Sequence, residues 1–488
     1  MTRNLLIKIL AILFPLLFLA ACGGGGGGGG GEATSKATTQ GFSSGAISGF
    51  GSVIVNGIHW SDDASVEITL DDDKGIKDDL KVGMVVEIEG DDSGNGSGKA
   101  RKIRFENIVR GPVESVDLTG GTLVVLGQTV KTSGATVFDN LVDLSGIAKG
   151  DIVAVSGWLD NLDPAQPNNI VARRIEKKPA PFSGVLKVKG FVKSLDGTAR
   201  TFKINNLVVD FGTAVFPNGS AAALKNGLFV DVRTNALPTP LGGTLVAESV
   251  KVKEVKPAVP EGAQVEVEGI ITDLDLVAKT FKVGGIPVDA KAIDISGLAN
   301  GMKVEVKGVF SNGVLVLGAG KVEREMEAHV KIQALVQATD ATGNTLTLLG
   351  KKVKVTPFTQ FRDKALDVRN FSLKDVLVGD GLEVRAFEDS NGDIVAVKIE
   401  RQIKPLQNVI LQGRMDSKDP AATSLTIIGV KVQGGSGTEW QLANQQQVNA
   451  ATWFANINVN SVVKAKGIEG ADGKSVDVTS GQVEVDED

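Results

Sequence analysis

GMKVEVKG, residues 301–308, follows Leu298 by three residues and recurs along the chain, and we call it the anchor stretch. Its valines are two residues apart with charged residues between them, which is the pattern of a strand with one buried and one solvent-exposed face. The opening glycine supplies a turn at low steric cost. Repetition every 67–81 residues predicts a chain of small repeated units. The other copies open at Gly83, Gly150, Gly227, Gly379 and Asn460.

Three further landmarks recur around the anchor stretch. The first is a strand of seven residues that opens with Gly, or with Ala at Ala334, and ends in Asp. The second is a two-residue hairpin turn ten residues after that Asp, and the third is Ala-x-x-Ile/Val after the anchor stretch. A bend can be held by a short acceptor side chain, so we expect the repeated aspartates to be structural. These aspartates are Asp117, Asp196, Asp275, Asp340 and Asp419.

The landmarks predict an all-β fold, a tandem array of six small five-stranded OB-like β-barrels. Proline-containing linkers near Pro179, Pro257 and Pro405 mark three boundaries, and semi-rigid linkers of this kind predict an elongated rod. End repeats of an array are expected to be atypical, as the first and sixth are here. The predicted repeats are 42–109, 110–181, 182–258, 259–325, 326–404 and 405–488.

The first 22 residues have the pattern of a lipoprotein signal. Arg3 and Lys8 precede an apolar core that ends in Leu19-Ala20-Ala21-Cys22, a lipobox-like sequence. Cys22 is the single cysteine, so we expect it to carry lipid after removal of residues 1–21. Residues 22–41 then form a glycine-rich tether, and we expect its flexibility to continue to about Gly45.

The composition excludes some classes of function. Aromatic residues are 5% with no Tyr, which leaves few side chains for stacking on bases. The formal net charge is −6 and becomes more negative once Arg3 and Lys8 are removed, so nucleic-acid binding is not expected.

The landmarks resemble a bacterial envelope repeat family, the domain of unknown function 5666. The resemblance rests on Gly111–Asp117, Thr136-Val137-Phe138, Gly150–Gly157 and Ala172–Ile175, and it covers nearly all of residues 42–488. These motifs are structural, so the resemblance implies no catalytic residue, cofactor or ligand.

Two motifs invite a chemical interpretation. Gly41-Phe42-Ser43-Ser44-Gly45 matches the nucleophile elbow of hydrolases, but that elbow needs a preceding strand and a following helix, and a loose linker is the alternative. Asp389, Asn391 and Asp393, with Glu400 further on, have part of the spacing of a Ca²⁺ loop, although ordinary Asx turns explain it as well. The two histidines, His59 and His329, are far apart, and we expect them at a surface or an edge strand.

The sequence therefore predicts a non-enzymatic, lipid-anchored protein of the bacterial cell envelope, attached to the outer membrane through Cys22. We expect a binding or spacer module without cofactor, whose partner is an envelope protein or polymer. The alternative is a calcium- or glycan-binding adhesin-like protein.

Overall fold

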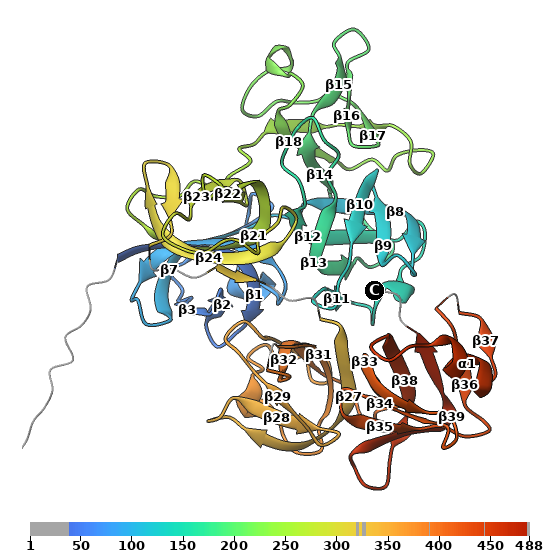
Figure 1. Cartoon of the computed structure of the whole chain (residues 1–488). Helices are drawn as coiled ribbons and strands as arrows, with labels where there is room; N and C mark the ends of the chain where they lie inside the picture. Colours follow the sequence, from blue (N-terminus) through green and yellow to red (C-terminus); the bar gives the residue numbers. More distant parts are fainter. Residues whose placement is uncertain (1–38, 319–321, 325–327, 390, 444, 486–488) are drawn as a thin grey trace, which may run out of the picture. The chain divides into compact units, whose positions relative to one another are not determined.

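The computed structural model describes residues 39–318, 322–324, 328–389, 391–443 and 445–485, and nearly all its regular elements are strands (Figure 1). The predicted signal, Cys22 and most of the predicted tether lie outside the described residues.

Residues 330–401 show the basic unit. Its strands are β27 (Val330–Asp340), β28 (Thr345–Leu348), β29 (Lys351–Lys354), β31 (Gly381–Glu388) and β32 (Ile394–Arg401). β27 pairs antiparallel with β28, β28 with β29, β31 with β27 and β31 with β32, while β29 and β32 pair in parallel. These pairings close a circuit with the strand order of an OB barrel, as predicted. The short strand β30 (Gln360–Asp363) and the 3₁₀ turn η4 (Leu373–Asp375) fill the long connection.

Several segments of the chain repeat this circuit, so the fold is a set of small five-stranded barrels. The first of these segments contains β1 (Thr39–Gly49), β2 (Val53–Val55), β3 (Ile58–Ser61), β4 (Glu67–Leu70), β5 (Asp73–Lys74), η1 (Lys77–Asp79), β6 (Val85–Asp92) and β7 (Ser97–Phe105). The next contains β8 (Val109–Asp117), β9 (Thr122–Val125), β10 (Gln128–Lys131), β11 (Val137–Asp139), η2 (Leu144–Gly146), β12 (Ile152–Leu159) and β13 (Ile170–Lys177). Residues 264–324 contain β21 (Gln264–Asp275), β22 (Thr280–Val283), β23 (Ile286–Asp289), β24 (Lys303–Ser311), β25 (Val314–Val316) and β26 (Val322–Arg324).

Two segments carry variations of the pattern. In the first, two strands are interrupted and the pairings fall into two sheets; its elements are β14 (Leu186–Phe191), β15 (Lys193–Asp196), β16 (Thr201–Ile204), β17 (Leu207–Asp210), η3 (Ala221–Ala223), β18 (Phe229–Thr234), β19 (Leu245–Val246) and β20 (Ser249–Val252). The second adds the helix α1 (Ala450–Asn456) to β33 (Val409–Asp419), β34 (Ser424–Ile427), β35 (Val430–Gln433), β36 (Glu439–Gln441), β37 (Gln447–Val448), β38 (Val462–Glu469) and β39 (Ser475–Val485).

The anchor stretch at Gly301–Gly308 consists of a turn and most of the strand β24. Its opening residue has a positive φ in every copy, 87° at Gly301 and 74° at Asn460, a conformation that glycine and asparagine tolerate best. In the copy at Gly301, the backbone N–H of Gly301 donates to the carbonyl of Ile271, and the N–H of Ile271 donates to Met302. These two hydrogen bonds join the start of the anchor stretch to β21, the first strand of the same barrel, next to the register shift that follows Thr272.

The predicted hairpin turns form, and they explain the glycine that opens the first landmark. Leu126 has a φ of 45°, an unusual conformation for a branched side chain, and it is fully buried. A Cβ atom at Gly111 would lie 2.4 Å from its Cδ1 atom. Gly111 therefore makes room for a hairpin residue that turns into the core.

Two expectations about the N-terminal part of the array are wrong. Flexibility does not continue to Gly45, because β1 begins at Thr39 and pairs with β6 on one side. On its other side, Gly41–Ser44 of β1 pair in parallel with Gln264–Val267 of β21. Contacts between barrels so far apart in the sequence contradict the rod, in which only consecutive barrels touch.

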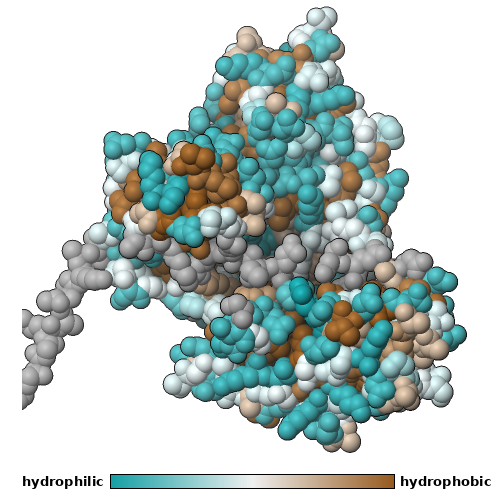
Figure 2. Space-filling model, viewed as in Figure 1, coloured by the Kyte–Doolittle hydropathy of each residue, from teal (hydrophilic) through white to brown (hydrophobic). Residues whose placement is uncertain are grey.

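Apolar side chains fill each barrel, and some cores extend across a contact. Val137 packs into the core of the first segment, beside Val82 and Met84. Figure 2 shows hydrophobic residues between hydrophilic ones on one face of the molecule, with a cluster over the segment of β22 and β23. In that segment Val277 is 97% exposed, and Leu276, Val309 and Val316 are also exposed.

Candidate functional site

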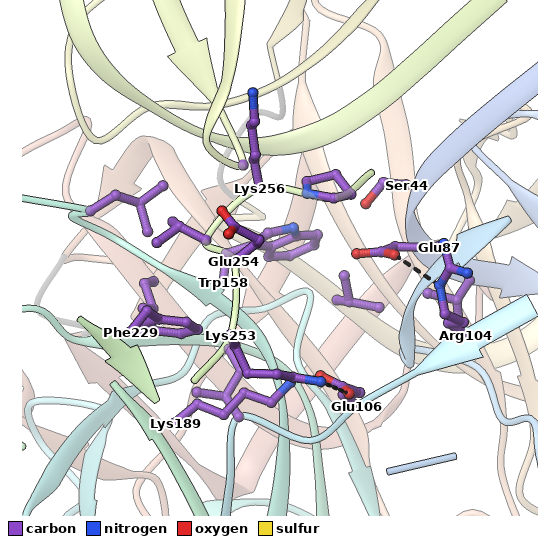
Figure 3. Close-up of a pocket in the computed structure, with 18 of the residues that line it drawn as sticks. Ser44, Glu87, Arg104, Glu106, Trp158, Lys189, Phe229, Lys253, Glu254 and Lys256 are labelled. Atoms are coloured by element: carbon purple, nitrogen blue, oxygen red, sulfur yellow. Dashed lines mark hydrogen bonds and ion pairs between the residues drawn. The ribbon is translucent and has the colours of Figure 1, made fainter. Parts of the chain in front are cut away.

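A cleft of about 470 Å³ opens where the segments 39–105, 109–177, 186–252 and 264–324 meet (Figure 3). Strand β6 contributes Glu87, β12 contributes Trp158 and β18 contributes Phe229. The connection from β20 to β21 forms another wall through residues 253–258. A volume of this size is that of a small-molecule site.

The lower part of the cleft in Figure 3 borders a network of charged side chains, which we call the charged cluster. It joins Asp71 and Asp72, which follow β4, to side chains of the segment 186–252. The four acids of this cluster are outnumbered by its six bases, so the acids are neutralised. The cluster consists of Asp71, Asp72, Glu106 and Asp231 with Arg110, Lys187, Lys189, Arg233, Lys251 and Lys253.

Lys187 is the centre of the charged cluster. Its Nζ atom lies 2.7 Å from Asp71 Oδ1 and 3.3 Å from Asp231 Oδ2, and its side chain is fully buried. Burial alone would raise the pKa of Asp71, but Lys187 and Arg110 together lower it. A buried charge needs such a partner, and the pair of Lys187 with Asp71 bridges the segments 39–105 and 186–252.

Three acids of this cluster have the geometry of a metal site. Ligand oxygens of Asp72, Glu106 and Asp231 lie within 4.8 Å of one another. Each of the three already has at least one cationic partner: Lys253 Nζ lies 2.5 Å from Glu106 Oε1, and Arg233 Nη2 lies 2.8 Å from Asp72 Oδ2 and 3.0 Å from Asp231 Oδ2. The surplus of bases disfavours a bound metal cation there.

A second charged contact joins the segments 109–177 and 330–401. Arg362 and Arg174 both pair with the carboxylate of Asp139. Lys398 donates to the carbonyl of Thr136 at 2.8 Å, and Lys364 pairs with the buried Glu400 at 2.9 Å. Burial lowers the pKa of Lys398 to about 8.

The candidate calcium residues are in a turn of the hairpin between β31 and β32. Asp389 Oδ1 accepts from the backbone N–H groups of Asn391 and Asp393, at 2.9 and 3.0 Å. The carboxylate of Asp393 pairs with Lys354. Glu400 is buried and paired as described above, so it does not complete a calcium loop with these residues. The arrangement is that of an Asx turn.

The other candidate residues lie apart. Ser43 is in the middle of β1, fully buried, and its Oγ accepts from Asn56 Nδ2 at 3.2 Å. This is not the strand–turn–helix of a nucleophile elbow. His59 is exposed on β3 and lies 3.4 Å from Ser52 Oγ, while His329 precedes β27. Cys22 lies outside the described residues.

The repeated aspartates hold hairpin backbones, as predicted. Asp196 Oδ1 accepts from the N–H groups of Thr198 and Ala199, both at 2.8 Å. Asp275 does the same with Val277 and Ala278. Asp117, Asp340 and Asp419 also accept backbone N–H groups of the turns that follow them.

The charged cluster and the cleft are not among the sites that the sequence predicts. The signal of the cluster was present in the alternating charged residues of the strands, for example Lys187 and Lys189 on β14, opposite Arg233 and Asp231 on β18. The alternation in the anchor stretches predicts a solvent-exposed strand face, and Asp231 is on such a face. In the structure a neighbouring barrel covers this face.

Closed five-stranded circuits with a shared anchor stretch define a protein of OB-like β-barrel repeats. The model of the family described as Domain of unknown function (DUF5666) matches residues 44–104, 110–176, 268–323 and 333–400, just over half of the chain. The chain therefore belongs to this family, as the resemblance implied. No curated protein matches the sequence.

Proposed function

We propose that this protein is a non-enzymatic binding or spacer module, anchored by lipid in the bacterial cell envelope and built from six OB-like barrels. The proposal rests on the structural roles of the repeated polar residues and of the buried polar residues. The aspartates hold turns, and the charged cluster joins barrels. Neither group presents a nucleophile next to a general base within the described part of the chain.

The barrel count of six rests on pairing in each segment. The strands of residues 186–252 complete a circuit when β14 is joined to β15 and β19 to β20, since β18 pairs with β14 and β20 while β17 pairs with β19. Residues 409–485 close through β33, β34, β35, β39 and β38. The family model does not match these two segments, so they are divergent copies in this proposal.

Anchoring rests on the sequence alone. Cys22 follows an apolar stretch and a small-residue site, and a lipidated cysteine with several acyl chains would make membrane attachment effectively permanent. The glycine run after Cys22 provides a tether of 16 residues before β1 at Thr39. No helix among the described residues is both long and apolar enough to span a bilayer.

Fractionation of cells tests the anchoring. The wild-type protein should be found with the outer membrane, its N-terminal peptide should begin at Cys22, and mass spectrometry should detect acyl groups there. Cys22→Ala should release the protein from that fraction. A wild-type protein that is already freely soluble would overturn the proposal.

A further inference from the structure

A short strand of the long connection covers the last strand of most segments. One edge of the last strand pairs with the strand of the anchor stretch, and the short strand pairs in parallel with the other edge. We call these short strands the covering strands, and the parallel pairs are β4 with β7, β11 with β13, β30 with β32 and β36 with β39. In the segment 186–252 a single bridge from Val215 to Ser249 of β20 takes this place.

The segment 264–324 has no covering strand among the described residues. Its long connection, residues 290–302, is the shortest of these connections and contains no strand. The second half of its last strand, β26, pairs with β24 and ends the strand order of its sheet, so the other edge of β26 has no pairing in the described part of the chain. We call this edge the open edge of β26. Natural proteins usually cover such an edge, because its unpaired N–H and C=O groups recruit other strands.

The open edge also leaves an apolar side chain partly uncovered. Val322 of β26 pairs with Val306, the sixth residue of its anchor stretch. The residues that pair with the sixth residue of the other copies are fully buried, whereas Val322 is only partly buried against the core of its segment. In four of those copies an apolar residue of the covering strand lies directly opposite. The opposed pairs are Ile68 with Ile103, Phe138 with Ile175, Phe361 with Ile399 and Trp440 with Val483.

The parallel direction of the covering strands indicates what fits the open edge of β26. Two copies of β26 related by a two-fold axis perpendicular to the sheet would pair antiparallel, and the covering strands of a second copy are used in its own barrels. The place therefore suits a short extended segment of another protein. The central residue of that segment should be large and apolar, as Phe361 is in the covering strand β30.

We propose that the open edge of β26 binds an extended peptide segment of a partner protein, which adds to the sheet as a parallel strand with a large apolar residue opposite Val322. Hydrogen bonds between the two backbones supply affinity, and burial of the apolar residue against Val322 supplies specificity. The bound segment takes the place that the chain's own covering strands occupy in other segments. This inference rests on the binding half of the proposed function and is independent of anchoring, so its failure and a failure of membrane attachment are separate results.

Titration of the purified full-length protein with a covering-strand peptide tests the site. The probe is a fluorescently labelled peptide of residues 359–364, Thr-Gln-Phe-Arg-Asp-Lys, which contains β30, and the control peptide carries Phe361→Ala. We expect the probe to bind at least tenfold more tightly than the control, which corresponds to about 1.4 kcal/mol, because the aromatic side chain is buried at this place in its own barrel. Equal affinity of the two peptides, or no saturable binding of the probe up to about 1 mM, would overturn the proposal.

Hydrogen exchange and two matched variants locate the bound peptide. Saturating probe should slow exchange of the amides of Val322–Arg324 at least tenfold in the wild-type protein. Val322→Lys should weaken binding of the probe at least tenfold, while Val316→Lys is the control, since Val316 is 41% exposed on the neighbouring strand β25.

Unchanged exchange at β26, or an equal loss of affinity in the two variants, would refute the site. A dimer of the wild-type protein that Val322→Lys abolishes would also overturn the proposal, because the occupant would then be a second copy of this chain. The exchange measurement on the wild-type protein decides the question even if Val322→Lys folds poorly.

Discussion

At the scale of single residues, the repeated positions are explained by backbone geometry. The anchor stretch opens with glycine or asparagine because φ is positive there, and the first landmark opens with glycine because a hairpin residue lies against it. Neither position needs a ligand to explain its recurrence.

Gly111→Ala tests this explanation. The added methyl group would overlap with Leu126, so we expect a loss of about 1–3 kcal/mol in the free energy of unfolding of that barrel, measured by chemical denaturation. Gly197→Ala is the matched control, because a Cβ atom there would meet nothing within 4 Å. Equal effects of the two substitutions would show that close packing is not the reason for Gly111.

A second residue-scale prediction concerns Asp196. Asp196→Ala removes the acceptor of two backbone N–H groups and should cost its barrel about 1 kcal/mol. Asp196→Asn retains an acceptor oxygen and should be nearly silent. Thermal melting of both variants checks this, and a large loss in Asp196→Asn would indicate that the negative charge itself is required.

At the scale of elements, the sequence predicted the strands well, since the period-two pattern, the hairpin glycines and the anchor stretch are local signals. It misjudged β1. Gly41, Ser43, Ser44 and Gly45 suggest a linker, but Ser43 is buried because the strand lies between β6 and β21. A partner more than 200 residues away leaves no local trace in the sequence.

Hydrogen exchange tests the element-scale account. The amides of Gly41–Ser44 lie in a strand paired on both sides, so we expect exchange at least a thousandfold slower than in an unstructured chain. Mass spectrometry of peptic peptides measures the rate. Complete exchange within seconds would support the linker interpretation instead.

At the scale of the whole molecule, charged strand faces that the sequence marks as wet are covered by other barrels. Lys187, Asp231 and Glu400 alternate with apolar residues, as exposed side chains of a strand would, but each is almost fully buried. Periodicity identifies the two faces of a strand, but it does not show whether the charged face contacts solvent or a neighbouring barrel. For the same reason, the sequence did not predict the cleft formed by these contacts.

Lys398 contributes to the pH dependence of stability. Its folded pKa of about 8 is below its ordinary value of 10.5, mainly because the charge is buried. Below pH 8 both the folded and the unfolded chain bind the proton, and the cost of burying the charge is fully present. Between pH 8 and 10.5 the folded chain releases this proton, while the unfolded chain still binds it. The contribution of Lys398 to the free energy of unfolding therefore rises with pH, by up to about 3 kcal/mol.

Chemical denaturation at several pH values measures this effect as the difference between the wild-type protein and Lys398→Met. The difference should shift in favour of the wild type as pH rises through this window. A constant difference would mean that Lys398 is not buried as a charge in this contact.

The central structural claim is that buried charge pairs join the barrels, and a double-mutant cycle on Lys187 and Asp71 tests it most directly. Lys187→Met and Asp71→Asn should each lower the free energy of unfolding by about 1.5–3 kcal/mol, because each removes the buried charge-assisted hydrogen bond between the two segments. The remaining charge is not left alone, since Asp71 keeps Arg110 and Lys187 keeps Asp231. The double variant should lose clearly less than the sum of the two, since the same direct bond is lost in either single variant. Small and additive losses would contradict the account, because they would mean that the two segments are not held together by this pair.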